Sequence, residues 1–457
     1  MRPLETLSLL LIGSTIYLLV FKKNKDLSLF NLFIAIISII VYHFFEGIRW
    51  QFNFAIFILP LLYIRLKISN QNNTVFFDRI IYFCFFLAFI IPYLIPVFNL
   101  PTPRGKYNIG TESFHWEDLN RKEWFTEEDN NDLRNLMVQV WYPSNIELDK
   151  KKENYIGDIT LRSETMAAAA KIPSFFPKHL RYINRNSYQN IAPANLKNKF
   201  PILIFSHGIT SSRHLHQTLF EHLSSKGYVV VAPNHSYDAN LTIFPNKKIA
   251  NYRSEITGHP DSLNIRKQQM ETRALDIIFI INQLEKIQSS KIKSRLNGLL
   301  NLDKIAIAGH SYGGATAVLA SKIDNRIKSC LVLDGWFSPL PDSVISSGLN
   351  IPFFCVGRPS WEGSDYPKNY LKLDDLIQSS SNTRKSIFIK NSLHLDFTDI
   401  PLFSPIINYV LDVSSNPVQI SIALINDLTF LFLEQSLFKK SNEDLDKHLL
   451  NEAIIVN

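Results

Sequence analysis

The segment from residue 304 to residue 321 constrains the fold more than any other part of the chain. Lys304–Ala308 (Lys-Ile-Ala-Ile-Ala) is a short apolar run, as found in strands that are buried on both faces. It leads into the pentapeptide Gly-His-Ser-Tyr-Gly at 309–313, and the run from Ala315 to Ser321 then favours a helix. A serine flanked by these glycines, between a strand and a helix, is typical of a sharp turn that exposes a nucleophilic hydroxyl. We therefore predict that Ser311 is the nucleophile of a serine hydrolase.

Strand and helix patterns alternate around this turn. Short apolar runs of the strand type lie at residues 136–142, 201–205, 228–232, 305–308, 330–333, 353–356 and 386–389. Helix-length segments lie at residues 160–188, 215–226, 264–289, 314–323 and 371–379. Strands that alternate with helices predict an α/β fold with a mostly parallel central sheet covered on both faces. We assign residues 100–435 to this catalytic domain and residues 436–457 to a charged C-terminal tail.

A serine hydroxyl needs a general base, and in sheets of this type the base follows the nucleophile along the chain. Only two of the twelve histidines, His394 and His448, follow Ser311. His448 lies in the charged tail with no strand before it, whereas His394 follows the strand pattern 386–389 by a short loop. We therefore expect His394 to be the base.

The acid that orients this histidine is less constrained. Asp334 directly follows the strand pattern 330–333, while Glu362 and Asp365 follow the next one, 353–356. Either position can place a carboxylate behind His394 to fix its tautomer. Spacing alone leaves the alternatives open, although Asp396 and Asp399 are too close to His394 in sequence to fit the usual order.

The oxyanion of an acyl-transfer intermediate requires two inward-facing backbone N–H groups. One is expected from Tyr312, directly after the nucleophile, and the other from the loop after an early strand. That loop follows residues 202–205 and contains His207, Gly208 and Ile209. Ile209 is the expected donor, because Gly208 lets the backbone bend, and His207 is expected to hold the loop by hydrogen bonding.

Four apolar stretches occupy the first 99 residues, at 4–21, 27–44, 50–64 and 80–98. A helix of about 20 apolar residues spans a bilayer, so three stretches are long enough and the third is short. We predict a multi-span transmembrane region of three to four helices over residues 1–99. Lysine and arginine concentrate in the first and third connections, which predicts that these face the cytoplasm. The catalytic domain of this multi-pass membrane protein would then be extracytoplasmic.

The remaining composition excludes several other classes. The formal charge of +7 is scattered and forms no basic stripe, so we expect no nucleic-acid partner. The three cysteines lie in apolar runs, which is typical of buried thiols and not of a disulfide framework. No cysteine and histidine spacing suggests zinc, and we expect neither a metal nor another cofactor.

Several blocks of residues 99–410 resemble the platelet-activating-factor acetylhydrolase family, of the plasma and intracellular type II branch, and its bacterial relatives. The blocks are Leu100-Pro-Thr-Pro-Arg-Gly-Lys-Tyr107, Met137-Val-Gln-Val-Trp-Tyr-Pro143, Phe205-Ser-His-Gly208, Gly309-His-Ser-Tyr-Gly-Gly-Ala315, Leu333-Asp-Gly-Trp-Phe-Ser-Pro339 and His394-Leu-Asp-Phe-Thr-Asp399. Residues 1–99 lie outside this resemblance.

The resemblance implies an α/β-hydrolase fold that acts without a metal on short or oxidised acyl esters of phospholipids. It implies that Ser311, Asp334 and His394 are nucleophile, acid and base, and that Ile209 and Tyr312 are the oxyanion donors. Small-molecule or lipid esters are thus the expected substrates, with the N-terminal helices in a membrane. An acyltransferase with the same residues, and a non-catalytic binding protein with this fold, are the alternatives.

Overall fold

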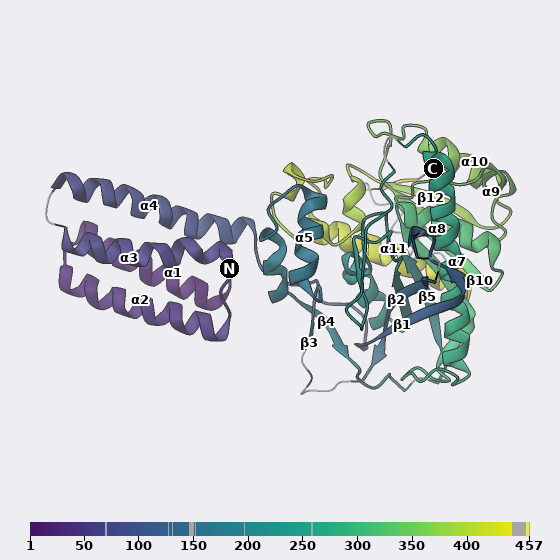
Figure 1. The fold of residues 1–457 in the computed structure, drawn as a ribbon, viewed down its shortest axis with the longest axis horizontal. Helices are drawn as coiled ribbons and strands as arrows, with labels where there is room; N and C mark the ends of the chain where they lie inside the picture. Colours follow the sequence, from purple (N-terminus) through teal and green to yellow (C-terminus); the bar gives the residue numbers. More distant parts are fainter. Residues whose placement is uncertain are drawn as a thin grey trace.

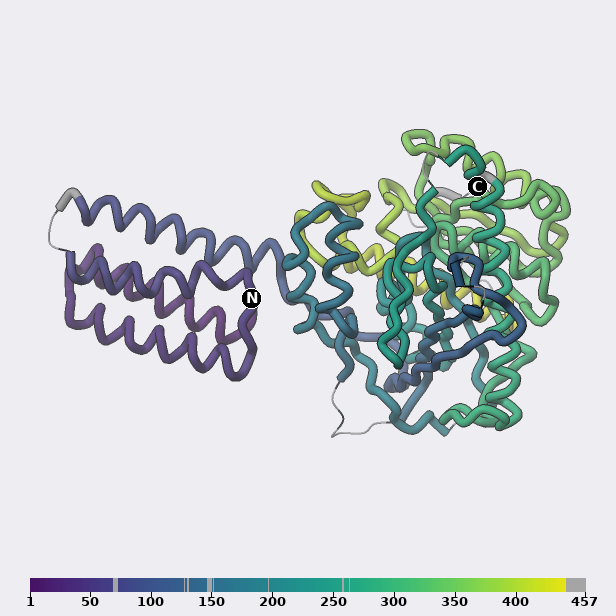
Figure 2. Tube along the Cα trace, viewed as in Figure 1, coloured from purple at the N-terminus to yellow at the C-terminus, as the bar shows by residue number. Residues whose placement is uncertain are grey.

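The chain forms a helical bundle followed by an α/β domain (Figure 1). The structure is a computed structural model, and it describes residues 1–68, 71–126, 128–129, 131–145, 150, 152–195, 197–256, 259–440 and 454–456. The bundle extends away from the α/β domain, and α4 leads from one to the other (Figures 1 and 2).

The bundle consists of four antiparallel helices. They are α1 (Pro3–Ile16, extended by a π-helical turn, Tyr17–Phe21), α2 (Lys25–Phe45), α3 (Asn53–Lys67, preceded by a 3₁₀ turn, Trp50–Phe52) and α4 (Gln71–Leu94). Small and aliphatic side chains such as Ile12, Ala35, Ile58 and Ala88 are fully buried between them. The N-terminus and the α2–α3 connection lie at the end near the α/β domain, and the α1–α2 connection lies at the far end (Figure 2).

Three helical segments of the bundle are long and apolar enough to cross a membrane, by length and composition: Pro3–Phe21, Lys25–Phe45 and Asn73–Leu94. The fourth predicted stretch, 80–98, actually belongs to a helix that begins at Gln71 and ends at Leu94. Helix α3 has 15 residues, which corresponds to about 22 Å, less than the roughly 30 Å of a hydrocarbon core. The short third stretch is therefore helical, but α3 alone is not a full span.

One further helix has the length and composition of a span: α11 (Val418–Phe438). Its apolar residues instead pack against the sheet of the α/β domain, where Leu428 and Leu433 are fully buried and Phe432 stacks on Phe354. We therefore count α11 as a core helix of the α/β domain.

The α/β domain contains an 11-stranded sheet. In spatial order its strands are β13 (Ile454–Val456), β12 (Arg384–Ile389), β11 (Phe353–Gly357), β10 (Ile327–Leu333), β9 (Leu300–His310), β5 (Phe200–Ser206), β6 (Val229–Asn234), β2 (Leu133–Ser144), β1 (Asn108–Lys122), β4 (Asn184–Gln189) and β3 (Lys152–Asn154). The pairs from β6 through β5, β9, β10 and β11 to β12 are all parallel, while β2 is antiparallel to both β6 and β1. The mostly parallel sheet predicted from the sequence is thus confirmed.

Helices cover both faces of this sheet because its central strands are apolar on both sides. In β9, Ile305 and Ile307 face one buried cluster, while Ala306 and Ala308 face the other. The first cluster is covered by α7 (Ser262–Gln288), α8 (Tyr312–Ile323), α9 (Asp342–Ser347) and α10 (Asn369–Ser379). The second is covered by α6 (Gln217–Ser225) and α11. Continuous apolar runs are therefore the correct signal for these strands.

Several elements differ from the expectation. The segment 160–188 is only partly helical: α5 (Ile159–Ala170) is followed by a 3₁₀ stretch (Phe176–Tyr182) and by β4. Strands β1, β3 and β4, and the small β7–β8 sheet (Leu241–Ile243 and Ile249–Asn251), were not predicted, because their short or polar sequences lack a strong pattern. Helix α11 continues to Phe438, and residues 454–456 add β13 to the sheet. These parts of the predicted tail thus belong to the α/β domain, and 441–453 lie outside the described residues.

Hydrogen bonds join the bundle to the α/β domain. The hydroxyl of Tyr182 donates to the carbonyl of Ile48 (2.6 Å), and the hydroxyl of Ser404 donates to the carbonyl of Leu94 (2.6 Å). Trp50 also packs against the ring of Phe176, at a centroid distance of 4.6 Å. These contacts hold one end of the bundle against one side of the α/β domain.

Candidate active site

Ser311 lies in a strained turn between β9 and α8. Its backbone has φ +57° and ψ −124°, which is an unfavourable conformation for a residue with a side chain. The turn is held by hydrogen bonds to the next strand: the N–H of Ser311 donates to the carbonyl of Leu333 (3.0 Å), and the N–H of Trp336 donates to the carbonyl of Ser311 (3.0 Å). A Cβ at Gly309 or Gly313 would collide with main-chain atoms, so the two glycines are required for this turn to close.

His394 approaches Ser311 from the loop after β12. Its Nε2 lies 2.9 Å from the hydroxyl oxygen of Ser311, and its Nδ1 lies 2.5 Å from Oδ2 of Asp334. Asp412 fixes the histidine loop, because its carbonyl accepts the N–H of Leu395 (2.9 Å). The structure thus brings the predicted nucleophile and base together.

Asp334 is the carboxylate that meets His394. It is fully buried at the end of β10, and its Oδ1 accepts the N–H of Arg358 (3.1 Å) and the indole N–H of Trp361 (3.2 Å). The alternatives Glu362 and Asp365 are exposed on the loop after β11. In this structure Asp334, which the sequence spacing left undecided, is the residue that is hydrogen-bonded to His394.

The loop after β5 passes directly beside Ser311. Its residues 207–211 include the predicted oxyanion donor Ile209 and are called the oxyanion loop below. A Cβ built on Gly208 would lie 3.3 Å from Cβ of Ser311, so a larger residue here would crowd the serine side chain and force one of the two to shift. Ile209 follows Gly208, and Tyr312 is the first residue of α8. Within the described residues, the N–H groups of Ile209 and Tyr312 have no protein acceptor. Both are therefore free to donate to a ligand.

Buried neutral histidines support these loops. His207 donates from Nδ1 to the carbonyl of Gly208 (2.7 Å) and accepts the N–H of His235 at Nε2 (3.1 Å), as a loop-holding role requires. Burial and the nearby charge of Arg273 keep the pKa of His207 well below its usual range, which is consistent with a neutral ring. His310 donates to the carbonyl of His394 (3.0 Å), and burial keeps its pKa low as well.

Sequence reasoning missed several residues around the site. His310 lies inside the pentapeptide at 309–313, and its position next to Ser311 could have indicated a role at the site. Arg358 and Trp361 contact Asp334 from the loop after β11, but nothing in their local sequence indicates this. Arg273 and Asp276 lie on α7 beneath the oxyanion loop, and a helix pattern gives no information about such a contact.

The arrangement has the parts needed for nucleophilic catalysis. A serine hydroxyl is hydrogen-bonded to an imidazole whose other nitrogen meets a buried carboxylate, so the imidazole can accept the hydroxyl proton. The serine also lies at the N-terminus of α8, where the partial positive charge favours an anion.

Comparison with known proteins identifies the family. Residues 96–452 match the family model described as platelet-activating factor acetylhydrolase, isoform II. The chain belongs to this family. It is 26% identical over 377 residues to the platelet-activating factor acetylhydrolase of Canis lupus familiaris, covering 76% of this chain and 79% of that one. It is also 29% identical over 136 residues to a probable 1-alkyl-2-acetylglycerophosphocholine esterase of Arthroderma benhamiae, about 30% of either chain.

A solved structure agrees on the fold. The ferulic acid esterase from Streptomyces cinnamoneus superimposes with a TM-score of 0.63 at 22% identity, covering 79% of this chain and 99% of that chain. The α/β domain therefore has the α/β-hydrolase fold expected from the resemblance. Family membership and the named relatives make this protein a carboxylic ester hydrolase.

Proposed function

We propose that the protein hydrolyses esters through a Ser-His-Asp triad formed by Ser311, His394 and Asp334, with a covalent acyl-enzyme. The observation that carries this proposal is the unbroken pair of hydrogen bonds from Ser311 through His394 to the buried Asp334. Such a chain activates a hydroxyl that is otherwise a poor nucleophile.

The reaction proceeds in two steps. His394 accepts the hydroxyl proton while the Ser311 oxygen bonds to the ester carbonyl carbon, and the N–H groups of Ile209 and Tyr312 stabilise the negative oxygen. The intermediate then collapses, His394 gives its proton to the leaving alcohol, and the acyl group stays on Ser311. Water attacks the acyl-enzyme in the same way, with His394 as base, and releases the acid. Asp334 keeps the imidazole oriented and stabilises its charged form.

We propose short acyl esters of phospholipids as the substrate class. The names of the relatives in Canis lupus familiaris and Arthroderma benhamiae, which refer to acetylated ether phospholipids, support this choice. The N-terminal helices support it independently, because a membrane anchor would keep the enzyme close to lipid esters.

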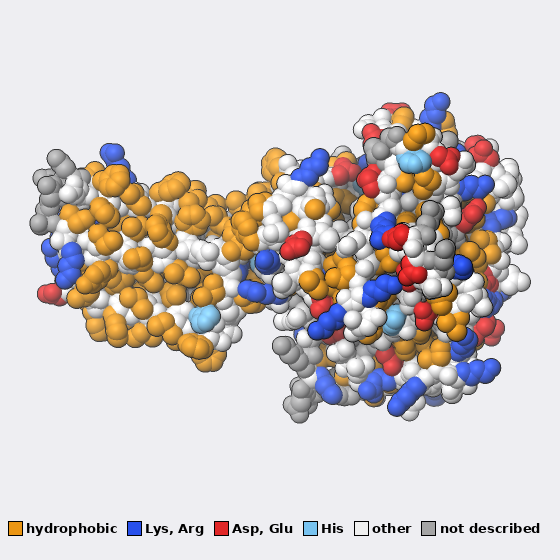
Figure 3. Space-filling model, viewed as in Figure 1, with side chains coloured by type: hydrophobic (Ala, Val, Ile, Leu, Met, Phe, Trp, Pro, Cys, Tyr) orange, Lys and Arg blue, Asp and Glu red, His pale blue; other side chains and the backbone are white. Residues whose placement is uncertain are grey.

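We further propose that the bundle spans a membrane and that the α/β domain lies outside the cytoplasm. Large apolar side chains such as Phe30, Phe33, Phe83 and Phe86 are exposed around the bundle, which forms an almost continuous apolar surface (Figure 3). Such a surface is unfavourable in water and favourable among lipid chains. Lysine and arginine gather at the far end of the bundle (Figure 3), where positive connections favour the cytoplasmic side.

The direct test compares wild type with Ser311→Ala on an ester panel that varies acyl length and head group. We expect wild type to react with a fluorophosphonate probe, and Ser311→Ala to lose labelling and about 10⁴-fold or more of its turnover. Ser321→Ala is the matched control, because Ser321 is also buried on α8 but bonds to the carbonyl of Ala317 and to the side chain of Cys330, away from the triad. Undiminished hydrolysis by Ser311→Ala would disprove the triad. Product analysis with an added acceptor alcohol separates hydrolysis from acyl transfer.

A further inference from the structure

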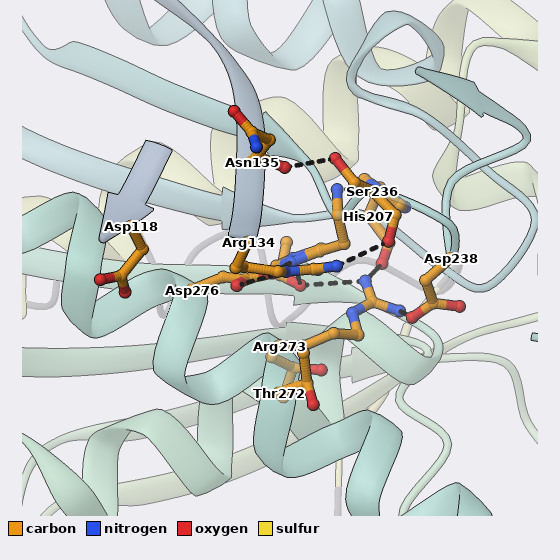
Figure 4. A network of polar contacts seen from close by, with 12 residues as sticks. Asp118, Arg134, Asn135, His207, Ser236, Asp238, Thr272, Arg273 and Asp276 are labelled. Atoms are coloured by element: carbon orange, nitrogen blue, oxygen red, sulfur yellow. Dashed lines mark hydrogen bonds and ion pairs between the residues drawn. The ribbon is translucent and has the colours of Figure 1, made fainter. Parts of the chain in front are cut away.

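Arg273 of α7 lies buried beneath the oxyanion loop, with 1% of its side chain exposed. Figure 4 shows its guanidinium between Asp238 and the segment that carries His207. A guanidinium has five donors in a fixed plane, so its hydrogen bonds restrain the position of the groups that accept them. Through these acceptors, Arg273 restrains the chain both before and after Ile209.

On the N-terminal side of Ile209, Arg273 holds the backbone directly. Its Nη2 donates to the carbonyl oxygen of His207 and to the hydroxyl of Ser206 (3.1 Å). The carbonyl of His207 belongs to the peptide that leads into Gly208. Because a glycine has few conformational restraints of its own, an external contact is needed to fix the peptide planes around it.

On the C-terminal side of Ile209, Arg273 acts through Asp238. The N–H of Thr210 donates to the main-chain carbonyl of Asp238 (3.2 Å), and the carboxylate of Asp238 pairs with Nη1 of Arg273 (3.1 Å). Thr210 has φ +56°, a conformation that a β-branched residue adopts only when its surroundings impose it. The same arginine thus restrains the residue before and the residue after Gly208–Ile209.

A second contact from α7 supports the same loop. Asp276, three residues after Arg273, accepts from Nδ1 of His235 (2.9 Å). Asp276 also pairs with Arg134 (2.6 Å), as Figure 4 shows. The backbone N–H of His235 in turn donates to the ring of His207. Arg134 bonds to Asp276 and therefore belongs to this network. Arg185 of β4 is a buried arginine outside it: its side chain is 5% exposed and donates to the carbonyl of Tyr155 (3.2 Å) and to the carboxylate of Glu153 (2.9 Å).

We propose that Arg273 is a positioning residue for the oxyanion hole: it fixes the peptide planes around Ile209 so that the Ile209 N–H points at the developing oxyanion. This inference rests on the triad and oxyanion roles proposed above. It requires the loss of Arg273 to weaken stabilisation of the tetrahedral intermediate while leaving ground-state binding of the ester nearly unchanged.

The test compares the full-length variants Arg273→Met, Arg273→Lys and Arg185→Met with wild type. The readouts are kcat and KM for p-nitrophenyl acetate, active-site concentration from burst titration, and binding of a trifluoromethyl ketone, which forms a tetrahedral adduct with the serine. A non-electrophilic ketone of the same shape reports ground-state binding.

For Arg273→Met we expect kcat per active site to fall about 10- to 100-fold, because misplacing one oxyanion donor costs part of its full contribution. The KM and the affinity for the non-electrophilic ketone should stay within about threefold, and trifluoromethyl ketone affinity should fall by the same factor as kcat. Arg273→Lys should give a smaller loss in the same proportion, since lysine keeps the charge but not the planar fork. Arg185→Met should lower thermal stability without lowering trifluoromethyl ketone affinity per active site.

Two results would overturn the proposal: kcat of Arg273→Met within threefold of wild type, or a fall in kcat with unchanged trifluoromethyl ketone affinity. If Arg273→Met does not fold, the same two criteria apply to Arg273→Lys. A failure of the triad itself is recognised separately, because Ser311→Ala would then remain active.

Discussion

Replacing Asp334 by asparagine changes the protonation of His394 without changing the shape of the site. Oδ1 of Asp334 accepts two hydrogen bonds, from the N–H of Arg358 and the indole N–H of Trp361. An asparagine will keep its oxygen on that side, because both of these groups are donors. Its NH₂ group then faces Nδ1 of His394, where the carboxylate oxygen stood at 2.5 Å.

The amide donor forces Nδ1 of His394 to act as an acceptor. The proton of the neutral imidazole must then sit on Nε2, which faces Ser311, so the ring can no longer accept the serine proton. The same tautomer defect in serine proteases lowers turnover about 10⁴-fold. That loss corresponds to about 5.4 kcal/mol of transition-state stabilisation. We expect a loss of this size in kcat for Asp334→Asn, with KM almost unchanged.

The assay measures hydrolysis of p-nitrophenyl acetate by Asp334→Asn, and thermal melting checks that the variant is folded. Asp365→Asn is the control, because Asp365 is an exposed carboxylate on the loop after the next strand. It should retain wild-type activity. Near-normal turnover of Asp334→Asn together with a large loss in Asp365→Asn would refute the assignment of the acid.

Three further predictions concern stability and topology. Gly313→Ala should cost about 3 kcal/mol or more of folding free energy, because its Cβ would meet main-chain carbonyls, whereas Gly363→Ala, with open space around it, should melt like wild type. His216 is buried and has a pKa of about 3, against 6.5 for a free histidine, so the unfolded chain takes up a proton below pH 6.5 while the folded chain does not. The stability that depends on a neutral His216 is therefore lost as pH falls from 6.5 towards 3. At pH 4.5 the free energy of unfolding of His216→Phe should exceed that of wild type by about 3 kcal/mol, but at pH 7.5 it should not. An equal difference at the two pH values would contradict this. Reporter fusions after residue 25 and after residue 110 should report opposite sides of the membrane, and the same side for both would reject the four-helix topology.

Most of the central sheet could be predicted from local sequence. Strands β5, β6, β9, β10, β11 and β12 coincide with the apolar runs to within a few residues at each end. This works because each is buried on both faces, so its pattern does not depend on its neighbours. Strand β1 was missed because most of its residues are polar, so it contains no apolar run. Helix α11 was missed because it is apolar enough to resemble a membrane span until its packing on the sheet is known.

The residues of the site divide in the same way. The sequence alone indicated Ser311 as the candidate nucleophile, because the strand, the glycines and the helix that shape its turn are contiguous. It also indicated His394 as the candidate base, because few histidines follow Ser311. The tertiary structure decided that Asp334, and not Asp365, meets His394, since that depends on where the ends of β10 and β11 lie relative to the loop after β12. It also decided that Arg273 supports the oxyanion loop. Contacts between residues far apart in the chain are set by the order of the strands and the packing of α7, and no local pattern records them.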